Sequence, residues 1–274
     1  MNKPVKHLLA VTTLLAGSMA HAAFGDFPPV LTNGSAQLAF SDNGSMSLGS
    51  GGVSIRTPAT LPGLPATDNR ASYASGTRQL DLALGSFTIS DDQRAAVATQ
   101  SLNSLVEFRR TVVDEDNPDS LTRYVVSMQD VEVDLVSATI YAKLSSSVRN
   151  GLDAPLVTDL GRQAIFQATQ VGLVGGTQGQ ITYVSDPDYP GSLRAHASGN
   201  FAGQLRMNTS TADTILGNLG LSTDANDPVA GLWRSVNWGT FGFTTSPVPE
   251  ASTYAMFGIG LLGVGAMTRR RARA

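Results

Sequence analysis

Apolar and polar residues alternate with period two in several segments of this chain of 274 residues. Successive side chains of a β-strand point to opposite faces, so this period predicts strands with one buried and one solvated face. The apolar positions are Ala36, Leu38 and Phe40; Leu80, Leu82 and Leu84; Val131, Val133 and Leu135; and Ile140, Ala142 and Leu144. Short strands separated by Gly, Pro and Asn turns predict an all-β body, built as an antiparallel sandwich or a barrel-like sheet.

The clearest hairpin candidate comprises residues 105–113 and 121–128, two β-rich runs that flank a polar loop. Further strands are expected at residues 180–184, 192–196, 201–207 and 236–243. One short helix is predicted at residues 211–221, where the apolar residues have helical spacing and a glycine follows them. The apolar positions of residues 91–104 fit either a second helix or a strand.

Residues able to perform catalysis are scarce, because the chain has three histidines and no cysteine. If an export leader removes His7 and His21, only His196 remains, and no G-x-S-x-G nucleophile elbow accompanies it. These counts exclude disulfides, thiolate ligands and the usual histidine-rich metal sites. We therefore expect no enzyme and no cofactor. A glycoside hydrolase stays an alternative, since it needs only two carboxylates and no spacing among the 22 Asp and Glu singles out a pair.

Three acidic turns, at residues 114–119, 186–188 and 224–227, concentrate the hard oxygen ligands that calcium prefers. In the first turn the calcium candidates are Asp114, Asp116 and Asp119. None of the three turns has the arrangement of an EF-hand loop with its glycine. Asp and Asn also bond to their own backbone in ordinary turns, which is the alternative reading of all three segments.

Both tryptophans of the chain, Trp233 and Trp238, lie in an aromatic run at residues 233–243. In one regular strand, Trp238 would point away from Trp233, and one face could stack on a sugar ring. The two tryptophans are thus candidate ligand-binding residues of a carbohydrate-binding module. The alternative, which we favour, is a bulge at Gly239 that places both tryptophans inside the body.

The first 22 residues have the order of a secretory signal peptide. Lys3 and Lys6 form a basic start, an apolar segment follows at residues 8–17, and Ala20 to Ala22 provides an A-x-A cleavage site. We predict export through the Sec translocon and a mature protein that begins at Ala23.

The carboxy-terminal residues 251–268 carry no charge. As a helix they would span about 27 Å, close to the roughly 30 Å of a hydrocarbon core. An arginine cluster follows at Arg269, Arg270 and Arg271, and it favours an orientation with the amino end of the helix outside the inner membrane. The precursor is therefore expected to contain a transmembrane helix.

A short motif precedes this helix and consists of Val248, Pro249, Glu250 and Ala251. With the glycine-rich apolar helix and the terminal arginines, it resembles the PEP-CTERM sorting signal of Gram-negative bacteria, with Ala251 in place of the second proline. The resemblance implies that a membrane-embedded exosortase recognises the tail, cuts near the motif, and releases or transfers the protein to the cell surface. It also implies a link with exopolysaccharide and biofilm.

These signals divide the chain into a leader at residues 1–22, a β-rich exported body at 23–243, a linker at 244–247 and a sorting signal at 248–274. Without the leader and the terminal arginines, 13 Lys and Arg stand against 22 Asp and Glu. An acidic body argues against nucleic acid as a partner. We expect a protein of the cell surface or extracellular matrix that touches the inner membrane transiently, with exosortase and exopolysaccharide as partners.

Overall fold

The computed structural model describes residues 31, 33–59, 69–113, 121–175, 179–185 and 193–245, without the side chains of 193 and 194. Its elements, in chain order, are β1 (Gly34–Phe40), α2 (Asp42–Ser50), β2 (Val53–Arg56), β3 (Ala71–Ala74), β4 (Gln79–Leu84), β5 (Ser86–Ile89), β6 (Ala96–Val113), β7 (Leu121–Asp134), β8 (Thr139–Asn150), β9 (Leu156–Ala168), β10 (Thr182–Ser185), β11 (Leu193–His196), β12 (Ser198–Asn200), β13 (Leu205–Met207), α3 (Thr209–Asn218), α4 (Pro228–Ser235) and β14 (Gly239–Thr245). The body is therefore mostly β, as the alternation predicts.

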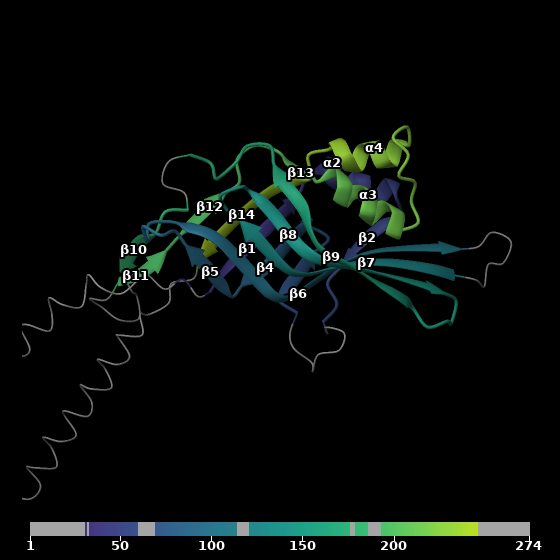
Figure 1. Ribbon diagram of the computed structural model, residues 1–274, viewed down its shortest axis with the longest axis horizontal. Helices are drawn as coiled ribbons and strands as arrows, with labels where there is room; N and C mark the ends of the chain where they lie inside the picture. Colours follow the sequence, from purple (N-terminus) through teal and green to yellow (C-terminus); the bar gives the residue numbers. More distant parts are fainter. Residues whose placement is uncertain are drawn as a thin grey trace, which may run out of the picture. The chain divides into compact units, whose positions relative to one another are not determined.

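One large sheet contains most of these strands, in the order β2-β6-β7-β8-β9-β13-β14-β1-β4-β3 (Figure 1). β4 pairs with β1, and β5, which follows it after Gly85, pairs with β6 near the other end of the sheet. Two bonds join the ends directly: Gly85 N donates to Gln100 O at 3.0 Å, and Ser101 Oγ donates to Ala83 O at 2.7 Å. The sheet is thus a nearly closed antiparallel barrel, the second of the two predicted architectures.

The period-two segments have the predicted inside and outside faces. On β7, Val131 and Val133 are buried, whereas the intervening Glu132 is half-buried and outward. The apolar residues of the segments at 36–40, 80–84 and 140–144 are buried as well. Their burial builds one continuous core along the inside of the sheet.

The predicted hairpin at 105–113 and 121–128 is confirmed, within strands that are longer than expected. The helical alternative for residues 91–104 is wrong, because Ala96 to Ser104 belong to β6. Here β6 pairs with β5 on one side and β7 on the other, and the hydroxyl of Thr99 bonds to Ser86 O at 2.8 Å. These ladder bonds outweigh a weak helical preference.

The described residues contain three helices, two more than the sequence analysis expects. The predicted helix is present as α3, which starts after Asn208; the Asn208 side chain accepts from Ser210 N and caps the helix. α4 begins with Asp227 as its cap and a proline in its first turn. α2 is rich in Gly and Ser and has little intrinsic helix preference. Its position depends on tertiary contacts with the aromatic core.

An aromatic core joins the helices to the sheet. Trp233, near the end of α4, and Trp238, just before β14, are both 0% exposed, with ring centroids 5.2 Å apart. Trp233 Nε1 donates to Ser47 O of α2 at 2.9 Å, and Trp238 also packs edge-on against Phe40 of β1. Each buried indole N–H therefore has an acceptor, since Trp238 Nε1 bonds to Trp233 O at 3.1 Å.

The last strand, β14, lies between β1 and β13 in the sheet, and its other end pairs with β12. It begins at Gly239, whose φ of 148° belongs to the region that favours glycine. A Cβ at this position would lie 1.9 Å from Ala39 O of β1, so the close approach of the two strands also requires glycine. β14 continues to Thr245, and the first two residues of the predicted linker at 244–247 therefore belong to the sheet.

Candidate ligand-binding site on the outer face of the sheet

A hollow of about 360 Å³ lies on the outer face of β5 to β9. It is lined by Ser86, Thr88, Glu132, Asp134, Tyr141 and Arg162, among others. The outward positions of five neighbouring strands supply these side chains, because every second residue of each strand faces away from the core. The hollow therefore combines hydroxyl groups, two carboxylates, one aromatic ring and one guanidinium group.

Arg162 is the cation among the residues that line this hollow. Its Nε donates to Glu132 Oε2 at 2.8 Å, and its guanidinium carbon lies 3.8 Å from the centroid of the Tyr141 ring. Gln100 Nε2 also donates to Glu132, at 3.4 Å. An arginine that is stacked on an aromatic ring and fixed by a carboxylate keeps free N–H donors in a defined direction, which suits a ligand with oxygen acceptors.

Asp134 is held by the backbone of the turn that follows β7. Its Oδ1 accepts from Val136 N at 2.9 Å and from Ser137 N at 3.0 Å. Burial acts to raise the pKa of Asp134, but hydrogen bonding from Ser137 and Val136 and the charge of Arg162 outweigh it and lower the pKa below its usual value. Asp134 is therefore an ionised carboxylate near neutral pH.

The two carboxylates of the hollow do not have the properties of a glycosidase pair. Such an enzyme needs one carboxyl group that keeps its proton near neutral pH and donates it to the leaving group. Glu132 is ion-paired with Arg162, and the pKa of Asp134 is lowered rather than raised. The hollow therefore presents polar groups to solvent, and its Asp134 does not have the raised pKa that such a proton donor needs.

The structure contradicts Trp233 and Trp238 as ligand-binding residues. Both side chains are fully buried, so neither indole can stack on a sugar from solvent. The run at 233–243 is also not one strand: Trp233 belongs to α4, and β14 begins only at Gly239. The favoured alternative, with both tryptophans inside, is confirmed, although a helix and a turn achieve it rather than a bulge within a strand.

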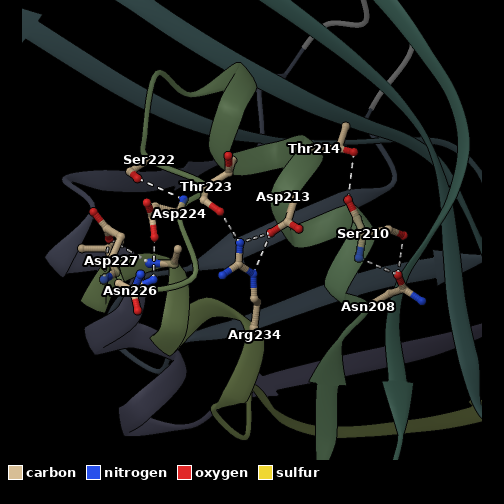
Figure 2. Close-up of polar contacts among 12 residues, drawn as sticks. Asn208, Ser210, Asp213, Thr214, Ser222, Thr223, Asp224, Asn226, Asp227 and Arg234 are labelled. Carbon is tan, nitrogen blue, oxygen red and sulfur yellow. Dashed lines mark hydrogen bonds and ion pairs between the residues drawn. The ribbon is translucent and has the colours of Figure 1, made fainter.

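The third acidic turn, at residues 224–227, is the one acidic turn that the structure describes, and it connects α3 to α4. Asp224 Oδ1 accepts from Asn226 N at 2.7 Å, and Asp227 Oδ1 accepts from Val229 N at 2.8 Å at the start of α4 (Figure 2). These bonds are the turn and capping interactions expected of Asp. Among the described residues, no group of three or more His, Cys, Asp or Glu could hold a metal ion.

The same region contains an arginine that ties the two helices together. Arg234 of α4 donates from Nε to Asp213 Oδ1 of α3 at 2.7 Å, and its terminal nitrogen donates to Thr223 O at 2.7 Å (Figure 2). The Arg234 side chain is 18% exposed, so this ion pair is partly shielded from solvent. The polar cluster of Figure 2 therefore fixes the helices and the connecting turn.

His196 has a structural environment. Its Nδ1 lies 3.2 Å from Thr245 O and 3.3 Å from Thr245 Oγ1, at the end of β14. It lies on β11, which pairs with β10. No carboxylate contacts its ring within the described part of the chain, so the geometry of a Ser-His-acid triad is not present there.

Several predicted site residues lie outside the described residues. They are the calcium candidates Asp114, Asp116 and Asp119, and the sorting residues Val248, Pro249, Glu250, Ala251, Arg269, Arg270 and Arg271. The leader and the expected transmembrane helix at 251–268 lie outside them too. Within the part that is described, no helix is long and apolar enough to cross a membrane.

The sequence analysis missed the hollow and its residues. The alternation at residues 131–135 places Glu132 and Asp134 on the outward face, but nothing in the sequence connects them to Arg162 of β9 or to Tyr141 of β8. The contact depends on strand register, which is shifted by irregularities in β7 and β9 near these residues. The sequence offered one signal for the hollow, namely an outward aromatic residue, Tyr141, in a strand near outward charged residues.

Comparisons with known proteins give one weak structural similarity and one sequence motif. Among curated proteins, none matches this chain significantly. The crystal structure of the C-terminal domain of HtaA from Corynebacterium glutamicum is similar with a TM-score of 0.33 and 12% identity, over 79% of this chain and 97% of that one. No argument about function rests on a similarity of this size. Residues 247–271 match the PEP-CTERM protein-sorting motif, and this tail identifies the chain as an exported precursor that is processed by exosortase.

Proposed function

We propose that this chain is a non-enzymatic protein of the cell surface or extracellular matrix that associates with exopolysaccharide. The observation that carries the proposal is the sorting motif at residues 247–271, which follows directly after β14. In the PEP-CTERM family, exosortase cuts the body from the membrane helix and releases it or transfers it to the cell surface, and the family is linked with exopolysaccharide. A polysaccharide matrix is therefore the environment in which the outer face of the sheet would function.

The arrangement of polar groups supports a binding role over catalysis. In the hollow, Glu132 is engaged by Arg162, and backbone N–H groups hold Asp134 ionised. His196 contacts Thr245 rather than a nucleophile or an acid. Hydroxyl groups and a stacked arginine, in contrast, are common partners of the oxygen-rich surface of a sugar.

Processing is tested on protein isolated from the native host. We expect the exported protein to end near residues 248–252 and to lack the apolar helix. The variant with Pro249→Ala and Glu250→Ala should stay at full length in the inner membrane, because a proline beside the membrane presents the extended backbone that a protease binds. Intact peptides from residues 257–274 on wild-type surface protein, or normal release of the double variant, would leave only a plain membrane anchor.

The binding role is tested with matrix polysaccharide extracted from the same host. Exported protein should co-sediment with the polysaccharide and leave its chain length unchanged after long incubation. Turnover that disappears in Glu132→Gln or Asp134→Asn would support the glycoside hydrolase instead, since removal of a general acid or base typically lowers the rate by 10² to 10⁴. Absence of any polysaccharide binding would contradict the proposed association.

A further inference from the structure

The hollow on the outer face of β5 to β9 holds several polar groups that are free to bind a ligand. The hydroxyl groups of Ser86, Thr88 and Tyr141 belong to its lining and form no hydrogen bond within the described part of the chain. Arg162 uses Nε and Nη2 to bind Glu132, and its Nη1 has no partner among the described residues. The hollow therefore offers hydroxyl groups, which donate and accept, beside a guanidinium group that only donates.

Three of the five strands have an irregular register beside this hollow. Each irregularity adjoins a lining residue, namely Thr88 on β5, Glu132 on β7 and Tyr141 on β8. Within the irregular part of β7, Asp130 has a φ of 51°, in the left-handed region that is unfavourable for a residue with a side chain. Irregularities of this kind change the direction of side chains and are frequent beside functional sites. Their convergence on one hollow points to a binding site rather than an ordinary stretch of sheet surface.

The charges of the hollow disfavour an anionic ligand. Glu132 and Asp134 carry negative charges against the single positive charge of Arg162, and bonds from backbone N–H groups stabilise the ionised Asp134. The body around the hollow is acidic as well, with 22 Asp and Glu against 13 Lys and Arg outside the leader and the terminal arginines. Acidic polymers and anionic lipids are therefore repelled. A cationic polymer meets the charge of Arg162, so a neutral ligand fits the hollow best.

The lining also disfavours an apolar ligand. Its apolar residues are Ala98, Val133 and Tyr141, and the side chain of Val133 is buried. The guanidinium carbon of Arg162 lies 3.8 Å from the centroid of the Tyr141 ring, so this face of the ring is covered and a ligand meets chiefly polar groups. With about 360 Å³, the hollow is near the lower end of the range of small-molecule sites, about 300–1,000 Å³. This size suits one or two units of a sugar chain.

We propose that the hollow binds a neutral sugar unit of the matrix polysaccharide, an inference that rests on the proposed function and deepens it by naming the site and the class of polymer. Hydroxyl groups of the sugar donate to Asp134 and accept from Arg162 Nη1, and they exchange hydrogen bonds with Ser86, Thr88 and Tyr141. Because each of these bonds contributes little in water and none requires a charged ligand, we expect weak binding that does not depend on salt.

The matrix polysaccharide of the native host provides the probe, divided by anion exchange into a retained acidic fraction and an unretained neutral fraction. Wild-type exported protein should bind the neutral fraction, and its affinity should change less than about twofold between low and high NaCl. Thr88→Val and Tyr141→Phe each remove one hydroxyl group and nearly keep the shape of the side chain. Each should weaken binding about three- to tenfold, and the double variant at least about tenfold.

The matched control is the double variant Thr158→Val and Tyr183→Phe, which removes the same two groups from exposed strand residues outside the hollow. It should bind the neutral fraction as the wild type does. Both double variants should keep the urea midpoint of the wild type, since neither changes a buried contact of the core.

Hydroxyl-radical footprinting of the wild-type protein locates the ligand without any substitution, and it decides the question if the midpoint of a variant falls. The neutral fraction should reduce the oxidation of Tyr141 and leave that of Tyr183 unchanged. Preferential binding of the acidic fraction, wild-type binding by the Thr88 and Tyr141 double variant, or an unprotected Tyr141 in bound protein would overturn the site while the proposed function stands. If the wild type binds neither fraction, both the site and the proposed function fail.

Discussion

Replacing Trp238 with alanine should destabilise the protein without a direct effect on any ligand. The side chain is 0% exposed and contacts the rings of Phe40, Phe166 and Trp233. Truncation of a buried tryptophan to alanine typically lowers the free energy of unfolding by about 3–5 kcal/mol. The lost N–H donor leaves Trp233 O without this bond, which adds about 1 kcal/mol. The variant should thus lose about a third or more of a total stability of about 5–15 kcal/mol.

A graded series makes this reasoning precise. Trp238→Phe keeps most of the apolar surface but loses the donor, so we expect a loss of about 1–2 kcal/mol. Leu232→Ala is the matched control on α4, because Leu232 is 41% exposed and its truncation should lower stability by less than about 1 kcal/mol. Urea unfolding, followed by far-ultraviolet circular dichroism, gives the midpoint and slope for each variant.

The reasoning would be refuted by an alanine variant whose stability lies within about 1 kcal/mol of the wild type. It would also be refuted if Trp238→Ala lost polysaccharide binding at unchanged stability, since that result requires an indole at the surface. Either outcome would restore the aromatic run at 233–243 as a candidate sugar platform.

Three further variants test other features. Gly239→Ala should lower the melting temperature by more than about 10 °C, because its Cβ would clash with β1, whereas Gly49→Ala, with no atom within 4 Å of its Cβ, should change it little. Asp134→Asn should lower the free energy of unfolding at pH 7. Because the pKa of Asp134 is lowered in the folded state, the ionised carboxylate stabilises the protein above about pH 4, and this stabilisation is lost as the pH falls through the pKa of the folded state. The urea midpoints of variant and wild type should therefore converge in acid. His196→Ala should lower the unfolding free energy by about 1 kcal/mol and leave any measured activity unchanged, which a urea midpoint and a turnover assay would check.

Alternation was sufficient to predict the strands that form the centre of the sheet. Val131 and Val133 are buried and Glu132 points outward, because a period of two leaves only one way to bury the apolar face. The same signal applies to β4 and β8. Strand pairing was harder, since β4 and β5 pair with different partners on either side of Gly85, and no local pattern indicates this.

The helices show where local signals were present but given too little weight. Asp227 and the following proline are clear start signals for α4, yet the aromatic residues after them suggested a strand. α2 also has a start signal, Ser41 as cap with Asp42 in the first turn, but the Gly and Ser residues that follow disfavour a helix, and its position depends on Trp233 and Trp238. Tertiary contacts determined this element.

The juxtaposition of Arg123 and Arg149 and the hollow could not be predicted from the sequence. Arg123 and Arg149 are 26 positions apart in the chain, and they become neighbours only through the register of β7 and β8. That register passes an irregularity between Gln129 and Glu132, which a count of residues from the hairpin loop does not reveal. Each arginine alone reads as an ordinary outward residue of an amphipathic strand.

The position of β14 determines when the sheet can be completed as the chain is synthesised and exported. β1 is the first described strand and β14 the last, yet they are direct neighbours over seven residue pairs. A chain that emerges from its amino end keeps β1 without this partner until almost the whole body has crossed the membrane, since contacts between distant segments form late. The sorting motif at residues 247–271 begins two residues after β14 ends. A chain that stops before β14 therefore lacks both the sorting motif and the strand that completes the sheet. An exported precursor that carries the motif for exosortase therefore also carries every strand of the sheet.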